Sequence, residues 1–247
     1  MRNTSAHAVS SRPVGLRLGA VDAGAAVLAC VAVLLVGLSL LTRYLAYRRE
    51  AASPGIEAPE WMTLFDVNSE ANVPTWFSVA LLAAAGAAAV GPGLLSRSAA
   101  PGRSRFFLGL AVVLLLLSLD EMAGIHERLG ALGAVVAGGS GLHFVWVVPG
   151  AAAAVLLLAG LVLGGRSLPS LIRRRLSFAA AVYLTGALVV EAVSGQVLAA
   201  HGDRAGYLVV TAVEELLEML GVVLVLRAVC GSMHACHASG GWTLQPL

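Results

Sequence analysis

The side chains of this chain that could do chemistry are carboxylates in otherwise apolar segments. Seven of the 14 acidic residues lie within or at the ends of long apolar runs, namely Asp120, Glu121, Glu127, Glu191, Glu214, Glu215 and Glu218. An ionisable group inside a bilayer is unfavourable by roughly 2.5–3.5 kcal/mol on insertion scales, and such groups usually mark functional sites. We therefore expect these acids to form a site, together with His126 and His143.

A carboxylate cluster of this density cannot be fully ionised unless cations accompany it. One solution is a divalent metal, because Asp, Glu and His from facing helices form di-metal carboxylate sites in helical bundles. The expected ligands of an iron, manganese or zinc ion are Asp120, His126, Glu127, His143, Glu191, Glu214 and Glu218. The metal would activate water or polarise a substrate oxygen, and Glu121 and Glu215 would be the catalytic residues that transfer protons.

Two other interpretations of the acid cluster stay open. The Glu-x-x-His spacing that is usual in di-metal proteins is missing, since residues 120–127 have the pattern DExxxxHE. The acids could instead form a buried salt-bridge network with Arg128 and Arg204, or a path for protons or cations.

The elements that position these residues are predicted to be membrane-spanning helices. Of the 247 residues, 58% are hydrophobic and only 12% are charged, whereas a soluble domain has about 25% charged residues. The mean hydropathy is +0.86. A formal net charge of +2 gives no basic surface for nucleic acid. The composition therefore predicts an all-α, polytopic membrane helix bundle.

Apolar runs give the number of spans, because about 20 apolar residues cross a hydrocarbon core of about 30 Å. We predict one transmembrane domain over residues 23–228, with six helices at about 23–42, 74–95, 106–127, 143–163, 176–199 and 205–226. In a continuous helix over 106–127, His126 would lie about 120° around the axis from Asp120. Residues 130–141 are rich in glycine and are predicted to form a loop.

The distribution of arginine predicts the orientation. All 16 basic residues are arginine, and eleven of them fall in the N-terminal tail, the second and fourth connections and the C-terminal end. Both termini are therefore predicted to be cytoplasmic, residues 1–22 as an N-terminal tail and residues 229–247 as a flexible C-terminal tail. The acids then lie toward the outer face.

A polar segment at 65–78 is predicted to lie on that same outer side. It supplies candidate contacts to a substrate through Asp66, Glu70, Asn72 and Trp76. Trp76 and Trp146 also fit an interfacial aromatic belt.

Three blocks of sequence carry a resemblance to known proteins. They are FDxxxExNxPTWFS at 65–78, SLDExxxxHE at 118–127 and EExxEM at 214–219. Together they resemble a group of uncharacterised bacterial multi-pass inner-membrane proteins, which implies a location in the bacterial cytoplasmic membrane. A fainter similarity is to the membrane hydrolases of the alkaline ceramidase and progestin-receptor superfamily, which have seven spans and bind zinc through Asp and three His.

Our first functional hypothesis is a metal-assisted enzyme embedded in the membrane. It would act on a lipid or another small hydrophobic substrate at the outer leaflet, and its partners would be membrane lipids. The alternative is a transporter or channel coupled to protons or cations through the same acids. A third interpretation is a non-catalytic membrane scaffold whose acids only hold the helices together.

Overall fold

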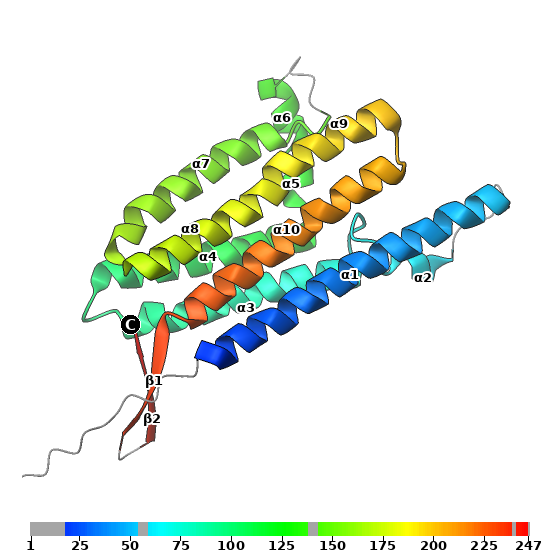
Figure 1. Cartoon of the computed structure of the whole chain (residues 1–247). Coiled ribbons are helices and arrows are strands. Elements are labelled where there is room, and N and C mark those ends of the chain that lie inside the picture. The colour runs from blue at the N-terminus through cyan, green and yellow to red at the C-terminus, as the bar shows by residue number, and fades with distance from the viewer. Residues whose placement is uncertain (1–17, 54–58, 138–142, 239–240, 247) are drawn as a thin grey trace, which may run out of the picture.

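The computed structural model describes residues 18–53, 59–137, 143–238 and 241–246, and it is a bundle of long helices that run in similar directions (Figure 1). The long helices are α1 (Leu18–Ala52), α3 (Val73–Leu95), α4 (Pro101–Ala123), α7 (Val147–Gly164), α8 (Ser170–Leu184), α9 (Glu191–His201) and α10 (Ala205–Cys230). Short elements connect them: α2 (Glu60–Thr63), α5 (Ile125–Arg128), α6 (Gly130–Ala137), the 3₁₀ turn η1 (Gly165–Ser167) and the π-helical segment η2 (Thr185–Val190).

The protein is a membrane protein by the length and composition of its helices. Within the described residues, five helical segments are long and apolar enough to cross a membrane: Gly19–Ala52, Val73–Leu95, Pro101–Ala123, Val147–Ser167 and Ser170–His201. The last of these is α8, η2 and α9 taken together. Helix α10 is of similar length, but it carries three glutamates and an arginine and is not among the five.

Helix α10 lies at the centre of the bundle and packs against α1, α3, α8 and α9. The main core consists of buried apolar side chains from α3, α4, α8 and α10, among them Leu82, Phe107, Ile172, Leu176 and Val229. Helix α7 is peripheral, since only 11% of its apolar stretch is buried, compared with 44% in α3. Its exposed side chains include large apolar ones, which an aqueous surface disfavours, namely Val155, Leu156, Val162 and Leu163.

Local sequence signals account for several helix ends. Asn72 caps α3, because its Oδ1 accepts the backbone N–H of Thr75 at 3.1 Å. Pro74 then occupies the first turn, where a missing N–H has no consequence. Pro101 begins α4 in the same way.

Three predicted elements in the middle of the chain need correction. The helix predicted at 106–127 is α4, which ends at Ala123, because Gly124 adopts a left-handed conformation that the following residues cannot continue as the same helix. The predicted loop at 130–141 begins instead with the short helix α6, and residues 138–142 lie outside the described part. Helix α7 begins at Val147 rather than 143, with Pro149 in its first turn.

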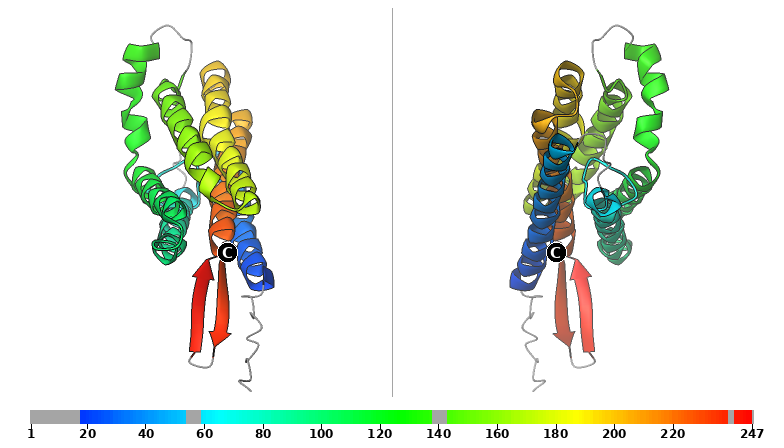
Figure 2. Two further views of the ribbon diagram at one scale, coloured as in Figure 1. Left: turned by 90° about the vertical axis from the view of Figure 1, so that its left-hand side faces the viewer. Right: turned by 90° about the vertical axis from the view of Figure 1, so that its right-hand side faces the viewer.

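The remaining differences concern the fifth helix and the two ends. The helix predicted at 176–199 is longer and is interrupted by η2, so that a new α-helix begins at Glu191. Helix α1 extends past the predicted residue 42 to Ala52. The segment predicted as a flexible C-terminal tail contains an antiparallel hairpin, β1 (Met233–Ala238) and β2 (Gly241–Pro246). The hairpin extends from the bundle at the end where α1 begins (Figures 1 and 2).

Candidate functional site

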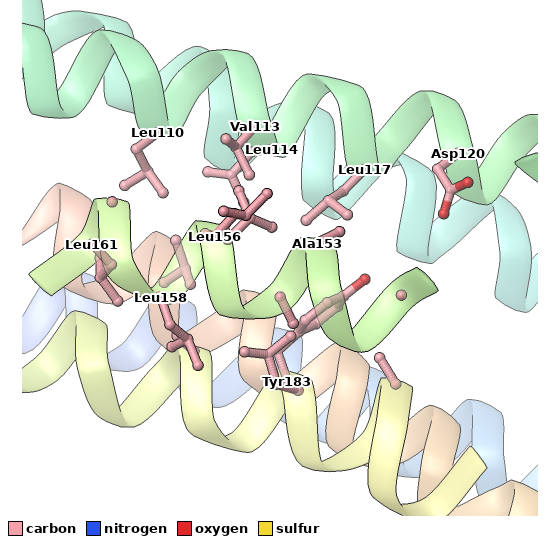
Figure 3. A pocket seen from close by; sticks show the side chains of 18 of the residues that line it. Leu110, Val113, Leu114, Leu117, Asp120, Ala153, Leu156, Leu158, Leu161 and Tyr183 are labelled. Atoms are coloured by element: carbon pink, nitrogen blue, oxygen red, sulfur yellow. The ribbon is translucent and has the colours of Figure 1, made fainter. Parts of the chain in front are cut away.

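A long apolar cavity of about 930 Å³ lies between α4, α7, α8 and α10. Figure 3 shows Leu110, Leu114 and Leu117 of α4 on one side of this cavity and side chains of α7 on the other. Asp120 lies near one end of the row of leucines (Figure 3). A volume of this size is in the range of pockets that enclose most of a small-molecule ligand.

A second cavity of about 470 Å³ adjoins the acid end of the first and is polar. Six residues line both cavities, namely Glu121, His126, Trp146, Glu191, Glu214 and Glu215. The polar cavity is also lined by the loop residues Asn68 and Glu70 and by Tyr207 of α10. Most of the predicted acids therefore lie where an apolar cavity meets a polar one.

The other end of the apolar cavity is basic. Arg105 near the start of α4 and Arg166 in η1 line it there, together with Ser167. Fifteen residues of α4 separate Arg105 from Asp120, which corresponds to about 22 Å at ~1.5 Å per residue. The cavity thus extends over more than half of a hydrocarbon core of about 30 Å.

Asp120 and His126 form a pair at the junction of the two cavities. Asp120 Oδ1 accepts the backbone N–H of His126 at 2.8 Å, and Asp120 Oδ2 lies 3.0 Å from His126 Nδ1. The pair exists because α4 ends at Gly124, which has a φ of +54° and donates its N–H to the carbonyl of Asp120. A Cβ on Gly124 would lie 2.7 Å from Glu70 Oε1, so the carboxyl of Glu70 also depends on this glycine.

Trp146 connects this pair to α9. Its ring lies 4.7 Å from the ring of His126, measured between centroids, and the two planes are tilted by 53°. Its indole N–H donates to Glu191 Oε1 at 3.3 Å. One aromatic side chain therefore contacts both a histidine and a carboxylate that line both cavities.

The π-helical segment η2 brings Glu191 next to α10. Gly186 in η2 touches α10 so closely that a Cβ there would lie 2.8 Å from the backbone oxygen of Glu214 and 2.9 Å from Glu218 Cγ. π-Helical turns are rare and often occur at functional sites. In α9, the hydroxyl of Ser194 donates to the backbone carbonyl of Glu191 at 2.9 Å.

Among the described acids of the cluster, Glu214 has the smallest exposed surface, 5%. Its Oε2 is buried and has no hydrogen-bond partner among the described residues. A buried polar atom without a partner is unfavourable by about 1–3 kcal/mol, more if it is charged, so this oxygen is a candidate contact for a bound molecule.

The other predicted acids and His143 also lie along the cavities. Glu215 lines both of them, whereas Glu218 and Asp120 line only the apolar one. His143 is exposed, lines the polar cavity and packs edge-on against Phe144. The side chain of Glu127 lies outside the described part of the chain.

Of the four predicted loop contacts, only Glu70 lines a cavity. Asp66 is buried and pairs with Arg43 at 3.0 Å. Asn72 caps α3 and donates to the carbonyl of Asp66 at 2.6 Å. Trp76 is 68% exposed on the surface of α3. Asp66 and Asn72 stabilise the loop, and none of these three residues lines either cavity.

The predicted metal centre has no assembled ligand set in the described structure. Among the described side chains, no three His, Cys, Asp or Glu residues form a group that could hold a metal ion. The predicted ligands that the structure describes line one or both of these cavities, and a metal bound there stays a prediction.

Tyr207 is a residue of the site that was not predicted. It lies on the face of α10 that carries Thr211 and the predicted Glu214, at the spacing i, i+4 and i+7, and all three line the polar cavity. That spacing is visible in the sequence and extends the polar face by one turn. Trp146 could not be assigned to the site from the sequence, because a tryptophan at this position also fits an interfacial aromatic belt. Arg105 and Arg166 fitted the arginines expected at the cytoplasmic boundary.

Of three comparisons with known proteins, only the comparison with family models finds a match. No curated protein and no solved structure matches the chain. A family model described as a domain of unknown function (DUF8692) matches residues 25–231, which include all the long helices from α3 to α10 and most of α1. The chain therefore belongs to the DUF8692 family.

Proposed function

We propose that this protein binds a lipid-like amphiphile in its apolar cavity and performs acid–base chemistry on the polar end of that molecule. The observation that carries the proposal is that an apolar cavity about 22 Å long ends on the Asp120–His126 pair and the glutamates. Apolar chains would occupy the leucine-lined part, and the polar end would then lie where the two cavities meet.

The proposal includes a topology of six spans with both termini in the cytoplasm. The acids of α10 line the cavities, and α10 is surrounded by α1, α3, α8 and α9, so its carboxylates need not face lipid. The excess of arginine in the tails and in the second and fourth connections favours this orientation. The acids then lie toward the outer face of what we propose is a bacterial cytoplasmic membrane.

The Asp120–His126 pair supports proton transfer. A carboxylate bonded to Nδ1 fixes the orientation of the imidazole and stabilises its protonated form, so that Nε2 exchanges the proton. Glu121 and Glu215, which line both cavities, are placed to pass protons between the polar cavity and the bound molecule. Hydrolysis is the reaction class that needs no co-reactant except water, which the polar cavity would supply.

Proton-coupled transport is the second candidate, and one observation favours it. Glu121, Glu191, Glu214 and Glu215 belong to both cavities, so protons could reach the interior of the bundle from the polar side. In this case the same amphiphile would be moved and not changed.

The first experiment tests whether the cavity holds an amphiphile. Ala153 lines the apolar cavity and its neighbour Ala152 does not, although both are exposed on α7. We expect Ala153→Trp to reduce several-fold the lipid that copurifies with the protein, measured by mass spectrometry of extracts, and Ala152→Trp to have no effect. Equal lipid content in the two variants would contradict the proposal.

A second experiment separates chemistry from transport. Lipid extracts of cells that produce the wild type are compared with extracts from cells that produce Asp120→Asn or His126→Gln. An enzyme predicts that one lipid species is depleted by the wild type only, with a new product. Transport predicts unchanged species and uptake into liposomes that depends on a pH gradient.

A further inference from the structure

The ionisable side chains that line the polar cavity are mostly acidic. Five glutamates line it, namely Glu70, Glu121, Glu191, Glu214 and Glu215. Among the described residues that line it there is no arginine, and His126 and His143 are the basic groups. The arginines that line the apolar cavity, Arg105 and Arg166, lie at its other end, and along α4 Arg105 is about 22 Å from Asp120. Such a surface attracts a cation and repels an anion.

A second observation favours a hydrogen-bond donor on the bound molecule, close to Glu214. Glu214 is 95% buried and lines both cavities, and its Oε2 has no partner among the described residues. A donor on a bound molecule would satisfy this oxygen. A carboxylate of this burial is stabilised most by a donor that also carries a positive charge.

An aromatic side chain lies beside the same position. The Trp146 ring lies between His126 and Glu191, and it lines both cavities. The indole N–H donates to Glu191 Oε1 and holds this carboxyl at the end of the apolar cavity. The carboxyl groups at the end of the apolar cavity are therefore complementary to an alkylammonium group.

We infer that the amphiphile carries an amine, bound as an ammonium group by Glu191 and Glu214 beside Trp146, with its apolar chain in the leucine-lined cavity. This inference rests on the proposed function, because it assigns the class of molecule that the same cavity takes. A neutral hydroxyl group would satisfy Glu214 Oε2 but would bring no positive charge to the glutamates, which cannot all be ionised without one. A carboxylate or phosphate head would add a further negative charge to the same site.

Three probes with the same chain test the assignment: dodecylamine, dodecanol and dodecanoic acid. Each is equilibrated with the purified protein in a nonionic detergent, and the bound amount is measured by mass spectrometry after dialysis. We expect the wild type to bind the amine at least about tenfold more tightly than the alcohol, the difference expected when a charged donor replaces a neutral one. The acid should bind more weakly than both.

Variants connect the preference to the named residues. Glu214→Gln and Glu191→Gln keep the shape of the side chain, and each should reduce the ratio of amine to alcohol several-fold while the alcohol still binds. Glu60→Gln is the matched control, because Glu60 is an exposed carboxylate of α2 outside both cavities, and it should leave the ratio unchanged. Ala153→Trp should weaken the binding of all three probes.

The outcomes distinguish this inference from the proposed function. If alcohol or acid binds as tightly as amine, the assignment of a cationic head is wrong and the apolar cavity still binds chains. If none of the three probes binds, the proposed function itself fails. Methylamine is the last control: if it binds as tightly as dodecylamine, the acids bind cations without using the apolar cavity, which would also overturn the inference.

Discussion

Asp120 uses both of its carboxylate oxygens to hold His126, one through the backbone N–H at 2.8 Å and the other through the ring Nδ1 at 3.0 Å. The two residues are close because the helix ends between them, at Gly124. In an unbroken helix the same residues would point in directions about 120° apart. The position of the histidine in the cavity therefore depends on one glycine in a left-handed conformation.

Gly124→Ala should destabilise the protein and displace His126. The φ of +54° is strained for alanine, and the new Cβ would lie 2.7 Å from Glu70 Oε1. We expect a loss of about 1–3 kcal/mol, which thermal unfolding in detergent would show as a lower melting temperature.

The matched control is Gly37→Ala in α1, where a Cβ meets nothing within 4 Å. Alanine favours a helix over glycine by up to about 1 kcal/mol, so this variant should be neutral or slightly stabilising. A Gly124→Ala protein as stable as Gly37→Ala would show that the left-handed turn is not required.

Gly221→Ala should separate α8 from α10. A Cβ on Gly221 would lie 2.6–2.7 Å from the Cβ, Cα and backbone N of Tyr183, and a backbone cannot move away as a flexible side chain can. Overpacking of this kind is unfavourable by about 1–3 kcal/mol. Gly206→Ala, in the same helix, meets only Val197 Cγ1 at 3.7 Å and should leave the melting temperature nearly unchanged.

Trp146→Phe should weaken the site without unfolding the bundle. The substitution removes the hydrogen bond from the indole to Glu191 Oε1 and keeps an aromatic ring near His126. We expect a loss of about 0.5–1.5 kcal/mol in stability and less copurified lipid. Trp76→Phe is the control, since Trp76 is 68% exposed and lines neither cavity, and it should retain wild-type lipid content.

The helices and the gathering of the acids could be predicted from the sequence because both depend on strong, local signals. Apolar runs of the right length predicted the long helices, and the unfavourable burial of carboxylates indicated a shared site. Glu121, Glu191, Glu214 and Glu215 do line the same two cavities. A helical period was sufficient to group Glu214 and Glu215 on one face of α10.

The local breaks in the helices could not be predicted, because the residue types at these positions are compatible with more than one backbone conformation or role. A glycine near a helix end, such as Gly124, fits a helix interior or a left-handed cap equally well. The π-helical segment before Glu191 shifts the face of the helix and leaves no mark in the sequence. Asp66 and Asn72 are the right types for a substrate contact, but they stabilise a turn and a helix start.

Arg43, in the C-terminal half of α1, joins three segments, and its loss should be far more harmful than the loss of its exposed partner Asp203. It pairs with Asp66, whose side chain is 3% exposed, and with Asp203, whose side chain is 51% exposed. Arg43→Met would leave the charge of Asp66 buried without a cation, for which we expect a loss of about 3 kcal/mol. Asp203→Asn should lower stability by less than about 1 kcal/mol.

Asp22 and Arg227 provide the comparison at the other end of the bundle, because their ion pair is 48% and 36% exposed. Asp22→Asn should therefore behave like Asp203→Asn, and high salt should reduce both effects while leaving that of Arg43→Met. Adding Asp66→Asn to Arg43→Met should recover part of the lost stability, since the buried charge is then removed. Equal melting temperatures for Arg43→Met and Asp203→Asn would mean that the burial of Asp66 does not control the stability of this contact.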